Sequence, residues 1–438
     1  MESKQLSTFP SWKKVRQFSP SGESLNMDDI YCSERVGHMA SCIMGELLVW
    51  GGFQDQSIGS GYCLNTSLWN YNMDMDRWFR YKPFGTAPPP MSGACCAVVW
   101  PFWYIFCGHG NAGQVNNIYR LNLLTCTWET VMPEGNIVSP RDKLVSWVFE
   151  DRIYIFGGYG PCPYEYLWDK EEDIFTKEAW SEEKGWNNQI AAFHLHAQCW
   201  QHVNTKGPKP LARAAHTAVR VGNAVYVFGG RHKGQRMGDL HCLNLLDFSW
   251  SGELCCLGEQ PEGRSWHTMA RLNKNQLVLM GGFNTSEEVL DDLWVLHIES
   301  LSWSVVKKNT GYPLLWHTAC PNSQGDILIF GGCMNNILDN HVDMAASSQI
   351  FTIRFEPFSL HRICLHILYK NLLSSQRDLL DLIKHHRKWL NLPIHHQDWI
   401  AARLNVDFEL NRWDFHFPAL AMHGPTLSQL TNIHTDGA

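Results

Sequence analysis

Apolar residues lead into a pair of glycines at Leu47-Leu48-Val49-Trp50-Gly51-Gly52, and this pattern returns at regular steps along most of the 438-residue chain. Five further copies, one of them degraded, occupy residues 104–108, 153–158, 225–230, 277–282 and 327–332. Measured between the last glycines, the steps are 56, 50, 72, 52 and 50 residues. A nearly constant period of this length predicts a repeat architecture, and the longest step indicates an insertion in the third copy.

The first five copies also contain a later tryptophan that follows two apolar residues spaced by two, such as Leu296, Ile298 and Trp303 in the fifth copy. Spacing by two is typical of a half-buried strand. A short β-prone run follows the tryptophan, and a strand that often opens with Arg-x-x-His precedes the glycines. Each copy therefore predicts four short strands, a to d, in a meander. The repeated tryptophans are Trp78, Trp128, Trp200, Trp250 and Trp303.

Four-stranded repeats with a Gly-Gly pair and a later tryptophan resemble the kelch family of β-propellers. The resemblance implies an all-β fold with six blades over residues 1–355. The sixth copy has its c strand at residues 350–355 but no following Trp-x-x-Val, and that pattern occurs instead at Trp12-Lys-Lys-Val. We therefore expect an N-terminal strand to complete the last blade and close the ring, which leaves no exposed sheet edge.

Residues that recur at one position of the repeat are predicted to be structural. Arginine and histidine recur together before the a strand, and we expect these pairs to bond between blades. The pairs are Arg35/His38, Arg213/His216 and Arg264/His267. The repeated tryptophans are likewise expected to be packing residues.

A meander places the d–a and b–c loops on one face, and candidate site residues gather there. They are Lys143, Tyr159, Trp186, Arg231, Arg236, Ser265, Trp266 and Trp316. All of them except Lys143 and Ser265 break the repeat, which favours a functional role. The insertion of the third copy also falls in its b–c loop, at about residues 160–190, and includes Trp180 and Trp186. Guanidinium groups bind carboxylates through paired hydrogen bonds, so two arginines and a hydroxyl among aromatic residues predict an anion pocket. A solvated loop is the alternative for any one of these residues.

After Phe355 the pattern changes to that of an amphipathic helix with Ser359 as a suitable N-cap. The apolar stripe of this helix consists of Leu360, Ile363, Cys364, Ile367 and Leu368. The run Ser-Leu-x-x-x-Cys-x-x-x-Leu resembles the BC box, with which substrate receptors of ubiquitin ligases bind elongin C. A helix that packs on the propeller is the alternative interpretation.

Leu392-Pro393 is similar to the start of a cullin box, which follows the BC box in such receptors. The Leu-Pro-x-Pro form associated with cullin-5 is absent, so the resemblance favours cullin-2. We expect residues 356–408 to form a helical BC-box and cullin-box segment and residues 409–438 to form a flexible tail.

A kelch propeller followed by a BC box resembles the kelch-repeat substrate receptors of cullin-2 ubiquitin ligases. The resemblance implies a non-catalytic subunit that binds C-terminal degrons, chiefly Gly-Gly ends, and promotes proteasomal degradation. It implies elongin C with elongin B, cullin-2 and its RING subunit as partners, with Gly-ended proteins as substrates. By the same resemblance Arg231, Arg236 and Ser265 would hold the terminal carboxylate. The other five residues of the predicted face would form the walls and the upstream contacts.

Composition excludes several other classes. A net charge of −7 disfavours a general nucleic-acid or anionic-membrane binder. No apolar run approaches the roughly 18 residues of a membrane span, and no signal peptide is visible. Fifteen cysteines without a signal are interpreted as reduced thiols, which predicts a cytoplasmic or nuclear protein.

Two other functions stay open on the sequence. The first is a kelch scaffold that binds an internal segment of a protein partner without ubiquitination. The second is an enzyme on a propeller. It ranks last because no metal cluster or nucleophile–base pair occurs at a suggestive spacing. We expect no cofactor and no metal.

Overall fold

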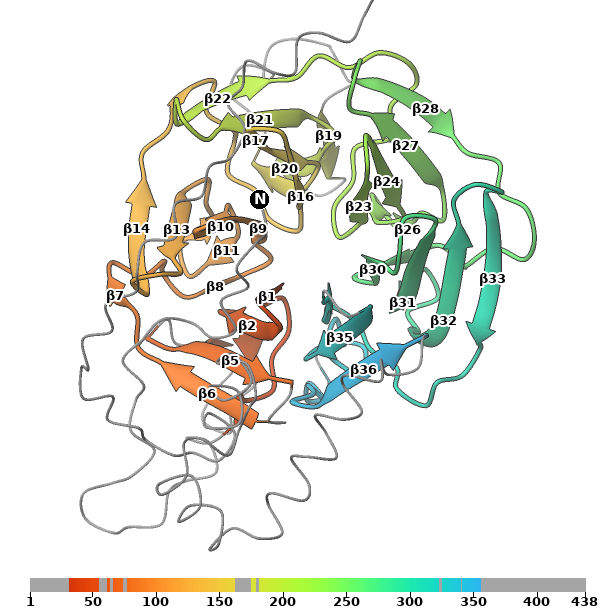
Figure 1. Cartoon of the computed structure of the whole chain (residues 1–438). Coiled ribbons are helices and arrows are strands. Elements are labelled where there is room, and N and C mark those ends of the chain that lie inside the picture. Colours follow the sequence, from red (N-terminus) through yellow and green to blue (C-terminus); the bar gives the residue numbers. More distant parts are fainter. Residues whose placement is uncertain are drawn as a thin grey trace, which may run out of the picture. The chain divides into compact units, whose positions relative to one another are not determined.

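Six main β-sheets surround a common axis in the part of the chain that the computed structural model describes (Figure 1). This part comprises residues 31–54, 61–63, 66–73, 77–161, 175–178, 181–322, 325–339 and 341–355. The sheets follow one another in chain order, and we number them blade 1 to blade 6. The all-β repeat fold expected from the sequence is therefore confirmed. No helix with the length and apolarity to cross a bilayer occurs among these residues.

Each of the first five blades is an antiparallel meander of four main strands. Blade 1 contains β1 (Met39–Ile43), β2 (Glu46–Trp50), β5 (Leu68–Asn72) and β6 (Arg77–Tyr81). Blade 2 contains β9 (Cys95–Val99), β10 (Phe102–Phe106), β13 (Ile118–Asn122) and β14 (Thr127–Val131). Blade 3 contains β16 (Val145–Phe149), β17 (Arg152–Phe156), β21 (Ile190–His194) and β22 (Cys199–His202). Blade 4 contains β23 (Thr217–Val221), β24 (Ala224–Phe228), β27 (Leu240–Asn244) and β28 (Ser249–Glu253).

The last two blades differ in length and strand number. Blade 5 contains β30 (Thr268–Arg271), β31 (Gln276–Asn284), β32 (Val289–His297) and β33 (Ser302–Lys307). Blade 6 contains β34 (Thr318–Pro321), β35 (Asp326–Phe330) and β36 (Ile350–Arg354), which are its three strands among the described residues. Two short strands, β7 (Phe84–Gly85) and β15 (Glu134–Gly135), run parallel to the outer strands of blades 2 and 3.

Short strands extend the blades at one end. They are β3 (Phe53–Gln54), β4 (Gly61–Tyr62), β8 (Met91–Ser92), β11 (His109–Gly110), β12 (Gly113–Gln114), β18 (Tyr159–Pro161), β19 (Phe175–Glu178), β20 (Ser181–Asn187), β25 (Arg231–His232), β26 (Gln235–Arg236) and β29 (Arg264–Ser265). Most of them belong to the b–c loops, and β8 and β29 lie in d–a connections.

Six backbone hydrogen bonds each link one blade to the blade before it. The residue two positions before each inner strand donates its N–H to the carbonyl oxygen of its equivalent in the preceding blade, at 2.7–3.1 Å. The bond from Gly37 to Trp316 joins the first blade to the sixth. All six residues have a positive φ of 54–66°. We call them the axial ring: Gly37, Gly93, Lys143, Ala215, Trp266 and Trp316.

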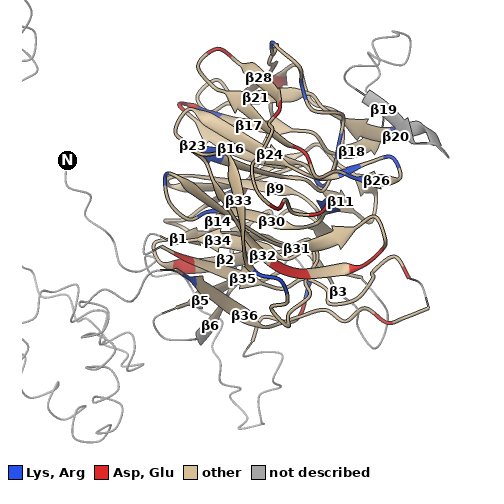
Figure 2. Cartoon of the chain, turned by 90° about the vertical axis from the view of Figure 1, so that its right-hand side faces the viewer, with Lys and Arg blue, Asp and Glu red and all other residues tan. Residues whose placement is uncertain are grey.

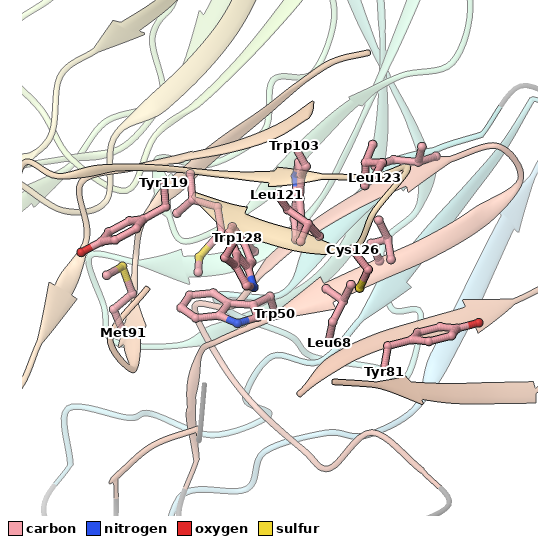
Figure 3. Close-up of a cluster of buried hydrophobic side chains, with 14 residues drawn as sticks. Trp50, Leu68, Tyr81, Met91, Trp103, Tyr119, Leu121, Leu123, Cys126 and Trp128 are labelled. Carbon is pink, nitrogen blue, oxygen red and sulfur yellow. The ribbon is translucent and has the colours of Figure 1, made fainter. Parts of the chain in front are cut away.

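Tryptophans of the outer strands pack between neighbouring blades, as expected. Trp128 of blade 2 meets Trp50 of blade 1 edge to face, with ring centroids 5.7 Å apart (Figure 3). The same contact recurs at Trp200 with Phe106, Trp250 with Phe156, Trp303 with Phe228 and Trp78 with Phe330. Each tryptophan thus fills the space beside the residue that precedes the neighbouring glycine pair.

The repeated arginines and histidines have separate structural roles. His267 bonds with Thr217 of the preceding blade, as His317 does with Thr268 and His38 with Thr318, at 2.7–3.0 Å. The prediction of bonds between blades is therefore confirmed for His38 and His267, and His317 forms the same bond without having been predicted. The ring nitrogens of the predicted His216 form no such side-chain bond among the described residues. For the arginines the prediction holds for the backbone, because the carbonyl oxygens of Arg35, Arg213 and Arg264 accept from the N–H of Gly332, Gly158 and Gly230 in the preceding blade at 2.8–2.9 Å. The arginine side chains bond instead within one blade, because each donates to the carbonyl oxygen of the first glycine in its own blade. These bonds link Arg35 to Gly51, Arg213 to Gly229 and Arg264 to Gly281 at 2.9–3.1 Å.

A fourth arginine with this role, Arg141, was not recognised in the sequence because Leu144 replaces the histidine of its blade. The same replacement explains the degraded glycine pair. In four blades the first glycine lies against the histidine of the next blade, as Gly157 does against His216, where a Cβ would come within 2.5 Å. Leu144 takes the place of that histidine beside Cys107, which can therefore carry a side chain at a φ of 60°.

Several predictions fall outside the described residues. They are the N-terminal strand at Trp12, Trp180 of the insertion, the BC-box stripe at residues 360–368, Leu392-Pro393, and the segments 356–408 and 409–438. The described residues belong to one unit, Met1–Ile363.

Candidate functional site

The b–c hairpins and the d–a connections lie at the same end of the blades, as the meander predicts. β3, β11, β18 and β26 mark this end in Figure 2. A cavity of about 720 Å³ opens there. Seven of the eight predicted site residues line it: Lys143, Tyr159, Trp186, Arg231, Ser265, Trp266 and Trp316. The eighth, Arg236, donates from Nε to Ser265 Oγ at 3.2 Å. Residues from four repeats are thus brought together.

Two sixfold positions of the repeat contribute most of their members to the lining of this cavity. The first is the axial ring, whose members also surround a narrower cavity of about 150 Å³. The second is the residue before each member of the ring, which is at most 4% exposed in every blade. These residues are Val36, Ser92, Asp142, Ala214, Ser265 and Leu315. Polar side chains therefore occur at this position in blades 2, 3 and 5 alone.

Arg231 and Arg236 face each other across the hairpin of β25 and β26. Gly229 and Gly230, with φ of 65° and 99°, end β24 and turn the chain into this hairpin. Neither guanidinium forms an ion pair with another described residue. Arg231 donates to Lys233 O at 2.8 Å, and Arg236 lies 4.4 Å from the ring centroid of Phe283.

Burial and the charge of Arg231 both lower the pKa of the Arg236 guanidinium. The lowering reflects an unfavourable site for a cation, with a second positive group opposite. An anion bound between the two guanidinium groups would relieve this repulsion.

Aromatic rings form two walls of the cavity. Trp266 stacks on Trp316 with centroids 5.4 Å apart, and Lys143 Nζ lies 5.5 Å from the Trp316 ring. On the other wall Trp186 meets Tyr159 edge to face at 5.5 Å. The Arg231 guanidinium lies 6.0 Å from the Trp186 ring. Such a site combines a cationic region with rigid apolar surfaces.

Lys143, Trp266 and Trp316 carry large side chains on a left-handed backbone. That conformation costs about 1–2 kcal/mol for a residue with a Cβ, and other blades place Gly37 and Gly93 at this position. Gly37 is required for a second reason, because a Cβ there would lie 2.6 Å from the Trp316 ring. Strain of this kind concentrates at functional sites.

Sequence reasoning missed several residues that line the cavity. Asp142 is 1% exposed, and one carboxylate oxygen, Oδ2, pairs with Lys143 Nζ. Aligning the copies would have found it, since it occupies the repeat position of Ser265. Tyr62 and His109 come from the b–c loops of blades 1 and 2, and Tyr62 Oη bonds with His109 Nδ1. Burial is the main cause that lowers the pKa of His109.

The b–c loop of blade 6 supplies an apolar part of the cavity that the sequence did not indicate. It contributes Ile337, Leu338, Val342 and Met344. Leu338 and Val342 are exposed, at 44% and 55%. This loop has no distinctive motif, so only the fold shows that it lines the same cavity as Arg231 of the β25–β26 hairpin (the arginine hairpin).

Comparisons with known proteins agree with the repeat architecture. A family model described as the KLHDC2/KLHL20/DRC7 Kelch-repeats domain matches residues 14–176 and 178–332. Kelch domain-containing protein 2 of Bos taurus is 35% identical over 377 residues, which cover 82% of this chain and 91% of the relative. Kelch domain-containing protein 1 of Mus musculus is 37% identical over 360 residues, covering 79% and 87%.

Among solved structures, that of YjhT matches 75% of this chain and 97% of that protein, with a TM-score of 0.56 and 15% identity. This likeness concerns the fold alone.

Proposed function

Because this chain belongs to the kelch-repeat family of kelch domain-containing proteins 1 and 2, we propose that it is a C-degron receptor of an elongin B/C–cullin-2 ubiquitin ligase. One observation carries the proposal. Two guanidinium groups, Arg231 and Arg236, face each other beside the buried Ser265 hydroxyl and have no carboxylate partner among the described residues. The terminal carboxylate of a substrate would supply that partner.

The proposed ligand is a protein C-terminus that ends in glycine or another small residue. Guanidinium groups bind a carboxylate through charge-assisted hydrogen bonds, which are the strongest in proteins. The tryptophans beside the arginines restrict the space for a terminal side chain, so small ends are favoured. A receptor of this kind performs no catalysis, and it acts by raising the concentration of its substrate near the ubiquitin-charged enzyme.

A peptide with a free or a capped C-terminus tests the proposal. A short synthetic peptide ending in Gly-Gly should bind the full chain as a free acid, and its C-terminal amide should not bind measurably under the same conditions in titration calorimetry. Equal binding of the acid and the amide would refute carboxylate recognition. It would favour a kelch scaffold that binds an internal segment of its partner.

The ligase part of the proposal depends on the BC-box stripe. Leu360 would enter an apolar pocket of elongin C, and the small Cys364 would allow close approach. Leu392-Pro393 would contact cullin-2, which brings its RING subunit. Co-expression in the cytoplasm should recover elongins B and C with the chain, and Leu360→Asp should abolish the recovery. Recovery of the elongins by that variant would refute the assignment.

Ring closure by an N-terminal strand is part of the same proposal. Five outer tryptophans pack beside the residue before a neighbouring glycine pair, and the equivalent residue of blade 5 is Met280. Trp12 would occupy the corresponding place beside Met280. Deletion of residues 1–18 should therefore lower the melting temperature sharply, and an unchanged value would contradict closure by this segment.

A further inference from the structure

A buried carboxylate outside the arginine hairpin also belongs to the cavity. Asp142 lines the cavity beside Lys143, and its side chain is 1% exposed. Its Oδ2 pairs with Lys143 Nζ, whereas Oδ1 has no hydrogen-bond partner among the described residues. Buried polar atoms in folded proteins are nearly always paired, and an unpaired carboxylate oxygen is costly. A ligand in the cavity is the natural source of the missing donor.

The repeat shows that Asp142 is not required by the blade itself. Its equivalents in the other blades are valine, serine, alanine, serine and leucine, so the fold accepts small or apolar side chains here. One equivalent is Ser265, which the proposed function assigns to the carboxylate. Asp142 lies in blade 3, next to the blade that carries the arginine hairpin. Its partner on a bound peptide would therefore be upstream of the terminus.

The charge of the site determines the kind of donor. Asp142 already neutralises Lys143, and a cationic ligand group at Oδ1 would be repelled by the adjacent ammonium group. A neutral N–H is therefore favoured. The Lys143 ammonium has three donors and is 23% exposed, so it can also donate to a ligand oxygen.

One residue of an extended peptide matches this arrangement. In a β-strand the N–H and C=O of the same residue point to the same side and bond together with a neighbour. We propose that Asp142 and Lys143 bind the N–H and C=O of one peptide residue upstream of the terminal carboxylate. The pair would thereby recognise the backbone of the degron and tolerate different side chains. This inference rests on the proposed function.

An ester scan of the ligand tests the inference. Replacing one peptide N–H at a time by an ester oxygen removes a donor without adding bulk. The probe is the Gly-Gly-ended acid, and binding to the full chain is measured by fluorescence anisotropy. One upstream ester should weaken binding to the wild-type chain about tenfold. The same ester should weaken binding to Asp142→Leu less than twofold, because the acceptor is already absent.

Control variants separate this role from a structural one. Asp151→Leu changes an exposed aspartate of the same blade and should keep the full tenfold ester effect. If Asp142→Leu fails to fold, Asp142→Asn provides the second variant. The asparagine lacks the charge and should reduce the ester effect to between twofold and fivefold.

The outcomes separate the two proposals. Failure of the wild-type chain to bind the free acid would refute the proposed function and this inference together. Binding of the acid, with every upstream ester tolerated by the wild type, would refute only the role of Asp142. An ester effect of the same size in the wild type and both Asp142 variants would refute it as well.

Discussion

Two pairs of arginines in blades 4 and 5 differ in what they bind. Arg213 and Arg264 are fully buried, and each donates two parallel hydrogen bonds to an aspartate of its own blade, Asp239 or Asp292, at 2.6–2.8 Å. Arg231 and Arg236 lie on a hairpin at the cavity and have no such partner among the described residues. The first pair is satisfied by the fold, and the second pair is available to a ligand.

The difference teaches how a repeat protein separates stability from binding. A residue at a repeated position finds the same partners in each blade, as the arginines do at the glycine carbonyls. A residue in a variable loop is free of that requirement, so its charge can be used for recognition.

Substitution of one of the buried arginines, Arg213 or Arg264, should have the largest effect, a loss of stability. Arg264→Ala removes the guanidinium donor of the Gly281 carbonyl and leaves Asp292 with the Trp294 Nε1 donor but no cation, and we expect about 3–5 kcal/mol less free energy of unfolding. Denaturant titration measures the change. The exposed Arg271 provides the control, and Arg271→Ala should change the free energy by no more than about 0.5 kcal/mol. Equal effects of the two substitutions would contradict the distinction.

Substitution of an arginine of the β25–β26 hairpin should instead weaken peptide binding. Arg236→Ala should weaken binding of a Gly-Gly-ended acid by about 1.5–3 kcal/mol, the range for a hydrogen bond to a charged group. The free energy of unfolding should stay the same or rise, because burial beside Arg231 is unfavourable for this cation. Calorimetric titration and unfolding of the same variant check both parts, and a destabilised variant with full affinity would reverse the assignment.

Acid should weaken the fold through the histidines between blades. Burial lowers the pKa of His317 to about 3, and burial with the neighbouring Arg213 lowers that of His216 to about 3. The unfolded chain gains a proton below about pH 6.5 that the folded chain does not bind. The contribution of each neutral histidine to the free energy of unfolding is therefore fully present above pH 6.5. It falls as the pH drops toward 3, by at most about 1.4 kcal/mol per pH unit for each histidine.

Unfolding titrations at pH 6.5 and 5.5 measure this loss. His317→Gln should lose less stability between these pH values than the wild-type chain does. An identical loss in both would show that this histidine does not contribute.

Two glycines of the axial ring test the role of Trp316 in binding, with the smallest expected effect on stability. Gly37→Ala and Gly93→Ala each place a Cβ on a left-handed backbone, at a cost of about 1 kcal/mol. At Gly93 the nearest atoms lie 3.5 Å from the new Cβ, whereas at Gly37 the Trp316 ring lies at 2.6 Å. Only Gly37→Ala should therefore weaken peptide binding as well. Equal affinities of the two variants would remove Trp316 from the binding site.

Most of the site could be predicted because its residues break a regular pattern. Arg231, Trp266 and Trp316 stand where other copies have different residues, and the alternation of loops placed them on one face. Asp142 was missed because a single aspartate beside a lysine resembles an ordinary surface pair. In the fold its backbone pairs with that of Tyr159 across the loops, a contact that the sequence does not indicate.

The sequence by itself determined the number of blades, the order of the strands, and which positions are repeated and which are variable. Periodicity carries this information, since each blade is folded by contacts within about 50 residues. Only the tertiary structure decided that Asp239 and Asp292 satisfy two of the arginines while the hairpin arginines stay without a carboxylate. It also decided that Asp142 is buried with one unpaired oxygen. These outcomes depend on how side chains from different strands and loops meet in space, and the residue pattern along the chain does not encode that arrangement.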